Sequence, residues 1–307
     1  MAIDIDIIGL DHGYLYTKDN LRNIFKSAYS RINTTLSEKY KITIDNEVFY
    51  FGSGTPTADT DKCSSIVNKV GTLSIMAMRG GREQHIVSGL PLAQYLNMKD
   101  KFAETIMQYN SCRVIYQDRI FTPNIKNVDI FAQGVGALIG IGLEDGKYIC
   151  FDIGSYTINV VLVQMKNGIP HIIKYDTWFD GILTLYNKII REVFDKCDNT
   201  IITIDDVEDI LTNGLNVKGE QKDLGFLKPI IRDYLENIFS KFKPNYPFDI
   251  YPILFIGGGS VFLNNILSNC FNNSMILPDA QFANAIGYCN FGLQKYGYLL
   301  ERRNIRA

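Results

Sequence analysis

The feature that most constrains the fold is a short pattern that occurs twice, about half a chain apart. In each copy an apolar, strand-forming run ends in Asp-x-Gly: residues 7–13 read IIGLDHG and residues 150–154 read CFDIG. Two copies of one supersecondary unit predict a duplicated fold with two similar halves. No Pro/Ser-rich linker separates the copies. We therefore expect the halves to pack closely around a cleft.

Asp-x-Gly at the end of a buried strand has a clear chemical use. The glycines, Gly13 and Gly154, allow a tight turn that brings backbone N–H groups close to a phosphate. The aspartates, Asp11 and Asp152, stand where they can hold Mg²⁺ directly or through water. A single Asp-x-Gly also describes an ordinary turn. Two copies that face one cleft instead predict a magnesium and phosphate site.

Two further stretches are candidates for ligand contacts. After Gly154, the run Ser155-Tyr156-Thr157 ends in a threonine whose hydroxyl can bond a terminal phosphate. The alternative is that Thr157 only begins the next strand. Gly257-Gly258-Gly259-Ser260 follows a predicted buried strand and precedes a helix, so its backbone can approach a ligand. It lacks the Lys-Ser/Thr ending of a Walker A loop. A flexible turn is the alternative interpretation.

Gln133 is the candidate for orienting water. It opens the run Gln-Gly-Val-Gly-Ala, between the two Asp-x-Gly units, in a segment that we expect to be helical over 128–141. A glutamine can orient an attacking water without acting as a base. An ordinary polar position on a helix is the alternative.

Hydrophobic periodicity and turn residues predict the other elements. Strands are expected at 3–10, 40–44, 48–51, 86–87, 114–116, 148–151, 158–163, 172–175 and 253–256. Helices are expected at 21–32, 64–78, up to about 109, 182–194, 226–242 and as a pair from Pro278. Asp45-Asn46 and Lys166-Asn167-Gly168 read as hairpin turns, Gly80-Gly81 as a helix end, and Asp205 as the N-cap of a helix that stops at Gly214.

Composition excludes several classes of protein. Hydrophobic residues make up 46% and charged residues 21% of the 307, which is typical of a globular protein. The formal net charge of -2 predicts no direct nucleic-acid surface. The six cysteines form no CxxC pair, so we expect reduced thiols in the cytoplasm. Neither a signal peptide nor a membrane-spanning run is predicted.

The order of these motifs resembles that of the actin superfamily and, within it, of the ParM/StbA family of plasmid-segregating bacterial actins. The similar segments span nearly the whole chain: residues 9–18, VSGLP at 87–91, QGVGA at 133–137, residues 152–157, FIGGG at 255–259 and PDAQFANAIG at 278–287. The resemblance implies an α/β, actin-like (ribonuclease H-like) duplicated fold with a nucleotide cleft between two domains. We expect domain I at 1–145 with the helix 290–307 packing back on it, and domain II at 146–289.

The resemblance also implies roles for individual residues. Asp11 and Asp152 would organise Mg²⁺, Lys18 would neutralise phosphate charge, and Gln133 would position a water that Asp152 polarises. ATP or GTP would contact Asp11, Gly13, Tyr14, Lys18, Gly154, Ser155, Tyr156, Thr157, Gly257, Gly258, Gly259 and Ser260. Two of these depart from the family, because Tyr14 stands where a small hydroxyl residue is common and Tyr156 is bulkier than the usual Gly or Thr.

The function implied by the resemblance is a filament-forming ATPase or GTPase that segregates plasmid or other low-copy DNA. Subunits would join head to tail, and a separate DNA-binding adaptor protein would attach the filament to DNA. No contact with a membrane is expected. A sugar-type kinase of the same fold and a non-polymerising actin-like scaffold remain the alternatives.

Overall fold

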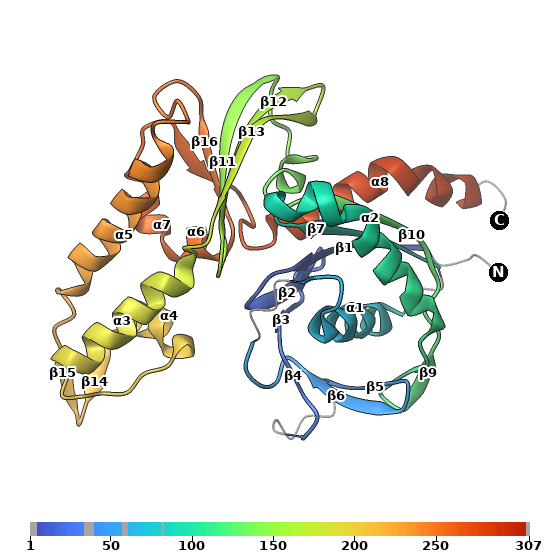
Figure 1. The fold of residues 1–307 in the computed structure, drawn as a ribbon, viewed down its shortest axis with the longest axis horizontal. Helices are drawn as coiled ribbons and strands as arrows, with labels where there is room; N and C mark the ends of the chain where they lie inside the picture. Colours follow the sequence, from blue (N-terminus) through green and yellow to red (C-terminus); the bar gives the residue numbers. More distant parts are fainter. Residues whose placement is uncertain (1–4, 34–39, 57–60, 81–82, 305–307) are drawn as a thin grey trace.

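The two halves of the chain are built on five-stranded mixed sheets of the same topology (Figure 1). The computed structural model describes residues 5–33, 40–56, 61–80 and 83–304. In the first half the sheet order is β10-β7-β1-β2-β3, from β1 Ile5–His12, β2 Tyr16–Asp19, β3 Ile24–Lys26, β7 Glu83–Leu90 and β10 Ile125–Ala132. In the second half it is β17-β16-β11-β12-β13, from β11 Gly146–Ile153, β12 Ile158–Lys166, β13 Ile169–Trp178, β16 Ile253–Ile256 and β17 Ser274–Ile276.

Strand directions match between the two sheets. The last three strands of each order form an antiparallel meander, β1-β2-β3 in one half and β11-β12-β13 in the other. The remaining strands run parallel to the first strand of that meander. The sequence repeat at Asp11 and Asp152 therefore corresponds to a repeated hairpin, and the predicted duplication of the fold is confirmed.

Helices and smaller sheets complete each half (Figure 1). The first half contains α1 Ile66–Arg79, α2 Leu92–Gln108 and a second sheet of β4 Tyr29–Ser30, β6 Glu47–Phe51, β5 Lys41–Ile44, β8 Val114–Tyr116 and β9 Arg119–Phe121. The second half contains α3 Ile182–Lys196, α4 Ile204–Asn213, the hairpin β14 Leu215–Val217 and β15 Glu220–Lys222, α5 Leu227–Phe242, α6 Gly258–Phe262 and α7 Asn264–Leu267.

Strand β12 shows why the second sheet is buried on both faces. Successive side chains of a strand point to opposite faces. Val160 and Leu162 belong to the core beneath α3, α4 and α5. Val161 and Val163 belong to a separate core that includes Leu92 at the start of α2. This second core joins the two halves.

The last helix, α8 Ala283–Asn304, packs against β1 and β7 of the first sheet (Figure 1). Glycines permit the close approach. A Cβ on Gly9 would lie 1.9 Å from the carbonyl oxygen of Ala285, and a Cβ on Gly287 would lie 2.0 Å from that of Gly136. The fully buried ring of Tyr288 fits between Gly89 and Gly136.

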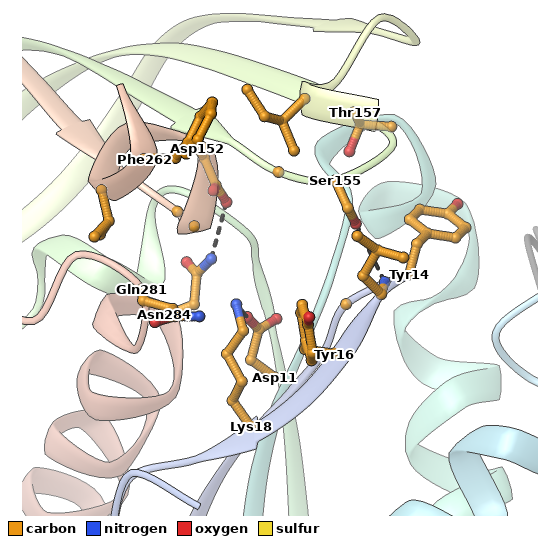
Figure 2. Close-up of a pocket in the computed structure, with 18 of the residues that line it drawn as sticks. Asp11, Tyr14, Tyr16, Lys18, Asp152, Ser155, Thr157, Phe262, Gln281 and Asn284 are labelled. Carbon is orange, nitrogen blue, oxygen red and sulfur yellow. Dashed lines mark hydrogen bonds and ion pairs between the residues drawn. The ribbon is translucent and has the colours of Figure 1, made fainter. Parts of the chain in front are cut away.

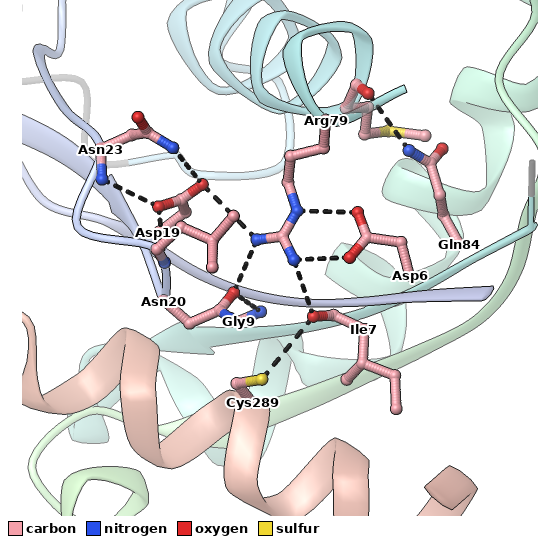
Figure 3. Close-up of polar contacts among 11 residues, drawn as sticks. Asp6, Ile7, Gly9, Asp19, Asn20, Asn23, Arg79, Gln84 and Cys289 are labelled. Atoms are coloured by element: carbon pink, nitrogen blue, oxygen red, sulfur yellow. Dashed lines mark hydrogen bonds and ion pairs between the residues drawn. The ribbon is translucent and has the colours of Figure 1, made fainter. Parts of the chain in front are cut away.

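A polar cluster anchors α1 to the back of β1 (Figure 3). Arg79, in the last turn of α1, donates to Asp6 Oδ2 from Nε at 2.7 Å and to Asn20 Oδ1 from Nη1 at 2.8 Å. Asn20 Oδ1 also accepts the backbone N–H of Gly9 at 3.0 Å. Asp6 of β1 is thus paired with an arginine whose side chain is only 9% exposed, as burial of charge requires.

Four predicted helix features are wrong. Residues 21–32 form β3 and β4 instead of a helix, because β3 pairs with β2 and Phe25 packs on Phe51. Residues 128–141 contain the end of β10, a turn at Gln133-Gly134 and a 3₁₀ turn at Gly136–Leu138, since pairing with β7 overrides the local pattern. Thr203, with Asp206, caps α4 in place of Asp205. A turn follows Pro278, so a single helix begins at Ala283.

Most other elements are confirmed to within a few residues. Asp45 and Asn46 have φ of 50° and 73°, as a two-residue hairpin turn requires. Gly80 ends α1 at φ 71°, whereas Gly81 lies outside the described residues. The six cysteines are free thiols, as predicted. Among the described residues, the structure has no helix with the length and apolar character needed to cross a membrane.

Candidate functional site

A polar cleft lies between the two sheets, at the carboxyl ends of β1 and β11 (Figure 2). The first half contributes Asp11, His12, Gly13, Tyr14, Leu15, Tyr16, Lys18 and Gln133 to its lining. The second half contributes Asp152, Gly154, Ser155, Thr157, Asn159, Gly257, Gly258, Gly259, Gln281 and Asn284, together with residues of α3, α4 and α6. The structure therefore brings the two sequence repeats into one cavity.

The two Asp-x-Gly hairpins have the same internal geometry. Gly13 N donates to Tyr16 O at 3.0 Å, and Gly154 N donates to Thr157 O at 3.0 Å. A Cβ on either glycine would lie within 2.9 Å of that same carbonyl oxygen. Each turn therefore needs glycine at this position for lack of space.

The same register sets the residue that faces each aspartate. Asp11 is paired with Lys18 across β1 and β2, and Asp152 is paired with Asn159 across β11 and β12. Lys18 Nζ lies 3.8 Å from Asp11 Oδ2. One aspartate thus faces a cation and the other faces an amide.

The two carboxylates are buried and hydrogen-bonded. Gln133 Nε2 donates to Asp11 Oδ1 at 2.9 Å. Asn284 Nδ2 donates to Asp152 Oδ2 at 2.9 Å (Figure 2). Asn284 Oδ1 also accepts the N–H of Gly134 at 2.9 Å, so this residue links the start of α8 to both halves.

Burial, followed by the nearby charge of Asp11, raises the pKa of Asp152 to about 6, although the Asn284 hydrogen bond and Lys18 act in the opposite direction. Two like charges in a site of low dielectric favour a cation between them. Mg²⁺ typically binds one or two carboxylates together with substrate phosphates. Asp11 and Asp152 fit that description. Among the described residues, no group of three or more potential metal ligands forms a protein-only cage.

The glycine turn after β16 packs directly on the second hairpin. Gly257 has φ 88°, and a Cβ there would lie 2.5 Å from Ile153 O and 2.6 Å from Asp152 Oδ1. A Cβ on Gly259 would lie 2.5 Å from the Ile153 side chain. The triple glycine therefore lets α6 start immediately beside Asp152.

Comparison with known proteins agrees with this geometry. Residues 9–136 match the family model described as the N-terminal domain of actin-like proteins. The chain has an actin-like fold. No match was found among curated proteins.

Three solved structures show how far the similarity in fold extends. A 15-stranded ParM filament from Clostridium botulinum is 21% identical with a TM-score of 0.76, over 94% of this chain and 99% of that one. The archaeal actin homolog Ta0583 in complex with ADP is 20% identical with a TM-score of 0.75, over 94% and 99%. Bacillus thuringiensis ParM with ATP is 12% identical with a TM-score of 0.65, over 94% and 98%. At these identities the likeness establishes the fold.

Two residues predicted from the sequence as ligand contacts do not line the cleft. Ser260 is fully buried, and its hydroxyl donates to the carbonyl oxygen of Ile256. The ring of Tyr156 packs on Tyr14 instead of facing the cavity. The other predicted site residues all lie on the cleft.

Several cleft residues were missed by sequence reasoning. Asn159 could have been found from register, because it occupies the position in the second hairpin that Lys18 occupies in the first. Asn284 lies in the segment 278–287, for which the sequence predicts close helix packing and no ligand contact. Tyr186 and Glu208 join the lining from α3 and α4, where the Tyr186 hydroxyl donates to Glu208 Oε1 at 2.5 Å. No local signal marks either of them.

Proposed function

We propose that this actin-like protein binds ATP or GTP with Mg²⁺ in the cleft, hydrolyses it and assembles head to tail into filaments. The observation that carries the proposal is the meeting of two matched acidic hairpins, with Asp11 and Asp152, at one cavity. Solved proteins of the same fold include filaments and complexes with ADP and ATP, which supports the proposal. We further propose the domain boundaries 1–145 with 290–307, and 146–289.

The residues divide the chemistry between the two halves. Lys18 lies beside Asp11 and offsets phosphate charge, while the turns at Gly13 and Gly154 hold the phosphate chain by their backbones. Mg²⁺, when bound by Asp11 and Asp152, neutralises the charge of the phosphates. Gln133 holds the attacking water in line, and the carboxylate of Asp152 accepts a hydrogen bond from it.

Filament growth follows from a head-to-tail contact, because such an interface does not close on itself. Nucleotide hydrolysis would switch the subunit between two interface affinities. We propose that the filament segregates plasmid or other low-copy DNA in the cytoplasm through an adaptor protein. The net charge of -2 supports indirect attachment to DNA.

Right-angle light scattering in parallel with phosphate release tests this function. With Mg²⁺ and ATP or GTP, scattering should rise and then decay as phosphate accumulates, because hydrolysis weakens the subunit interface. Addition of a non-hydrolysable analogue should give the rise without the decay. Transfer of phosphate to a sugar, without assembly at any protein concentration, would instead assign a kinase.

Replacement of Gln133 by alanine should slow hydrolysis about 10- to 100-fold with little loss of nucleotide affinity, since glutamine orients water and does not bind the phosphates. Filaments should therefore last longer. Single-turnover phosphate release and the scattering decay measure both effects. Gln108→Ala, at the exposed end of α2, provides the control and should behave as the wild type. Unchanged turnover in Gln133→Ala would remove Gln133 from this role.

A further inference from the structure

The loops of the two hairpins touch each other as well as the cleft. The ring centroids of Tyr14 and Tyr156 lie 4.9 Å apart at an interplanar angle of 49°. Beside them, the N–H of Leu15 donates to Ser155 Oγ at 3.2 Å (Figure 2). An aromatic pair and a hydrogen bond thus connect the first loop to the second. Phe179 also contacts the Tyr156 ring, edge to face, with 6.0 Å between the ring centroids.

A buried lysine completes this contact from behind the first loop. Lys62 precedes α1 and is only 3% exposed. Its Nζ donates to the carbonyl oxygen of His12 at 2.8 Å and lies 4.3 Å from the centroid of the Tyr14 ring. Lysine is rarely buried unless its ammonium is paired, and a carbonyl oxygen and a ring face both attract it. Lys62 therefore holds the first loop at both His12 and Tyr14.

The charge behind the loop comes from Lys62 and not from its neighbour His12. Complete burial, with the Lys62 ammonium close by, lowers the pKa of His12 to about 3, so the imidazole is neutral near pH 7. His12 Nε2 forms its hydrogen bond with Thr72 Oγ1 at 3.0 Å. Lys62 itself does not line the cleft. It can influence a ligand only through the loop that it holds and through its charge.

We propose that Lys62, Tyr14 and Tyr156 form a cation–aromatic stack that sets the spacing of the two phosphate-binding loops. The inference rests on the proposed nucleotide site and adds two positioning residues, Lys62 and Tyr156, that do not line the cleft. It also accounts for the two unusual residues in the sequence. Tyr14 and Tyr156 are large because they contact each other where the loops meet.

The stack predicts an effect on the choice between triphosphate and monophosphate that ordinary core packing does not predict. Loosening the loops should weaken binding of the terminal phosphates, which both loops would surround, more than binding of the nucleoside and its first phosphate. A side chain that serves stability alone would leave this preference unchanged. The ratio of triphosphate to monophosphate affinity therefore separates positioning from packing.

The test uses the whole protein, with Tyr156→Leu and Tyr156→Phe as one matched pair and Lys62→Met and Lys62→Arg as the other. Fluorescent nucleoside triphosphate and monophosphate are titrated with Mg²⁺ into each variant. Leucine and methionine should lower triphosphate affinity about tenfold, with monophosphate affinity changed less than about twofold. Tyr156→Phe and Lys62→Arg should keep most of the wild-type triphosphate affinity, because phenylalanine keeps the ring and arginine keeps the charge.

The double variant Lys62→Met, Tyr156→Leu adds a second criterion. Both residues act through Tyr14, so the combined loss should be smaller than the product of the two single losses. Circular dichroism melting confirms that each variant is folded. Because methionine keeps most of the lysine volume, Lys62→Met tests the stack even where Tyr156→Leu unfolds the protein.

The results distinguish this inference from the proposed function. Equal losses for triphosphate and monophosphate, or unchanged binding in Tyr156→Leu and Lys62→Met, would overturn the stack while leaving the nucleotide site in place. A wild-type protein that binds no triphosphate would overturn both.

Discussion

Replacement of Asp152 by asparagine should stabilise the nucleotide-free protein and, at the same time, remove its hydrolytic activity. The pKa of Asp152 rises from 3.8 to about 6 because the group is buried near Asp11. The folded state therefore holds this proton more tightly than the unfolded state. The stability that results is fully present below the unfolded pKa of 3.8 and is lost as the pH rises through about 6.

At pH 7.5 the ionised Asp152 should thus destabilise the wild type by roughly 2–3 kcal/mol relative to a neutral side chain. Asparagine keeps the shape and an oxygen that can accept the Asn284 hydrogen bond. Thermal unfolding without Mg²⁺ or nucleotide, from pH 4 to pH 8, measures the effect. Wild-type melting temperature should fall across this range more steeply than that of the variant, and the gap should narrow when Mg²⁺ and nucleotide are added.

Hydrolysis by Asp152→Asn should fall at least about 100-fold, since the variant lacks both a metal-binding carboxylate and the group that accepts a hydrogen bond from water. Asp100→Asn, on the exposed face of α2, controls for the loss of one negative charge and should change neither property. If the melting temperatures of wild type and Asp152→Asn changed equally with pH, ionisation of the buried carboxylate would not be destabilising the folded protein.

The second large effect concerns two glycines of one helix, for which the same substitution should have opposite signs. A Cβ on Gly287 would lie 2.0 Å from the Gly136 carbonyl oxygen and 2.9 Å from Ala137 Cα, both of which are backbone atoms. Relief of the clash requires α8 to move away from the first half. Gly287→Ala should therefore destabilise the protein by about 2–3 kcal/mol.

Ten residues further along α8, a Cβ on Gly297 would lie more than 4 Å from every described atom outside its own stretch of helix. Alanine there should stabilise the helix by about 0.5–1 kcal/mol, because glycine loses more backbone freedom on folding. Urea unfolding midpoints of the two variants measure the difference. Destabilisation of similar size in both would mean that general helix packing, and not the contact at Gly136, decides the outcome.

The fold could be predicted from the sequence wherever a pattern is local. An Asp-x-Gly turn after an apolar strand, or Asp45-Asn46 between two strands, carries its conformation in adjacent residues. Two such turns predicted both the duplication and the meeting of Asp11 and Asp152 in one cavity. Lys18, a candidate only through the family resemblance, lies in the cleft because the return strand of the same hairpin places it opposite Asp11.

Prediction failed where distant partners decide the structure. Residues 128–132 become a strand because β7 lies beside them, and the glycines at 134 and 136 then form a turn that receives Tyr288 and Asn284. The role of Lys62 is equally invisible, since nothing near it in sequence indicates that Tyr14 will lie beneath its ammonium. Such contacts join residues that lie far apart in the sequence, and they leave no periodic signal.

The shared register of the hairpins, with Lys18 opposite Asp11 and Asn159 opposite Asp152, gives the cleft an electrical polarity that its backbone lacks. The matching backbones of the two hairpins would not by themselves distinguish the two ends of an elongated ligand. One wall carries the Asp11–Lys18 ion pair, whereas on the other wall Asp152 faces the amide of Asn159. The proposed ligand, a polyanion accompanied by a divalent cation, would therefore meet two unlike walls, and charge would favour one direction of binding.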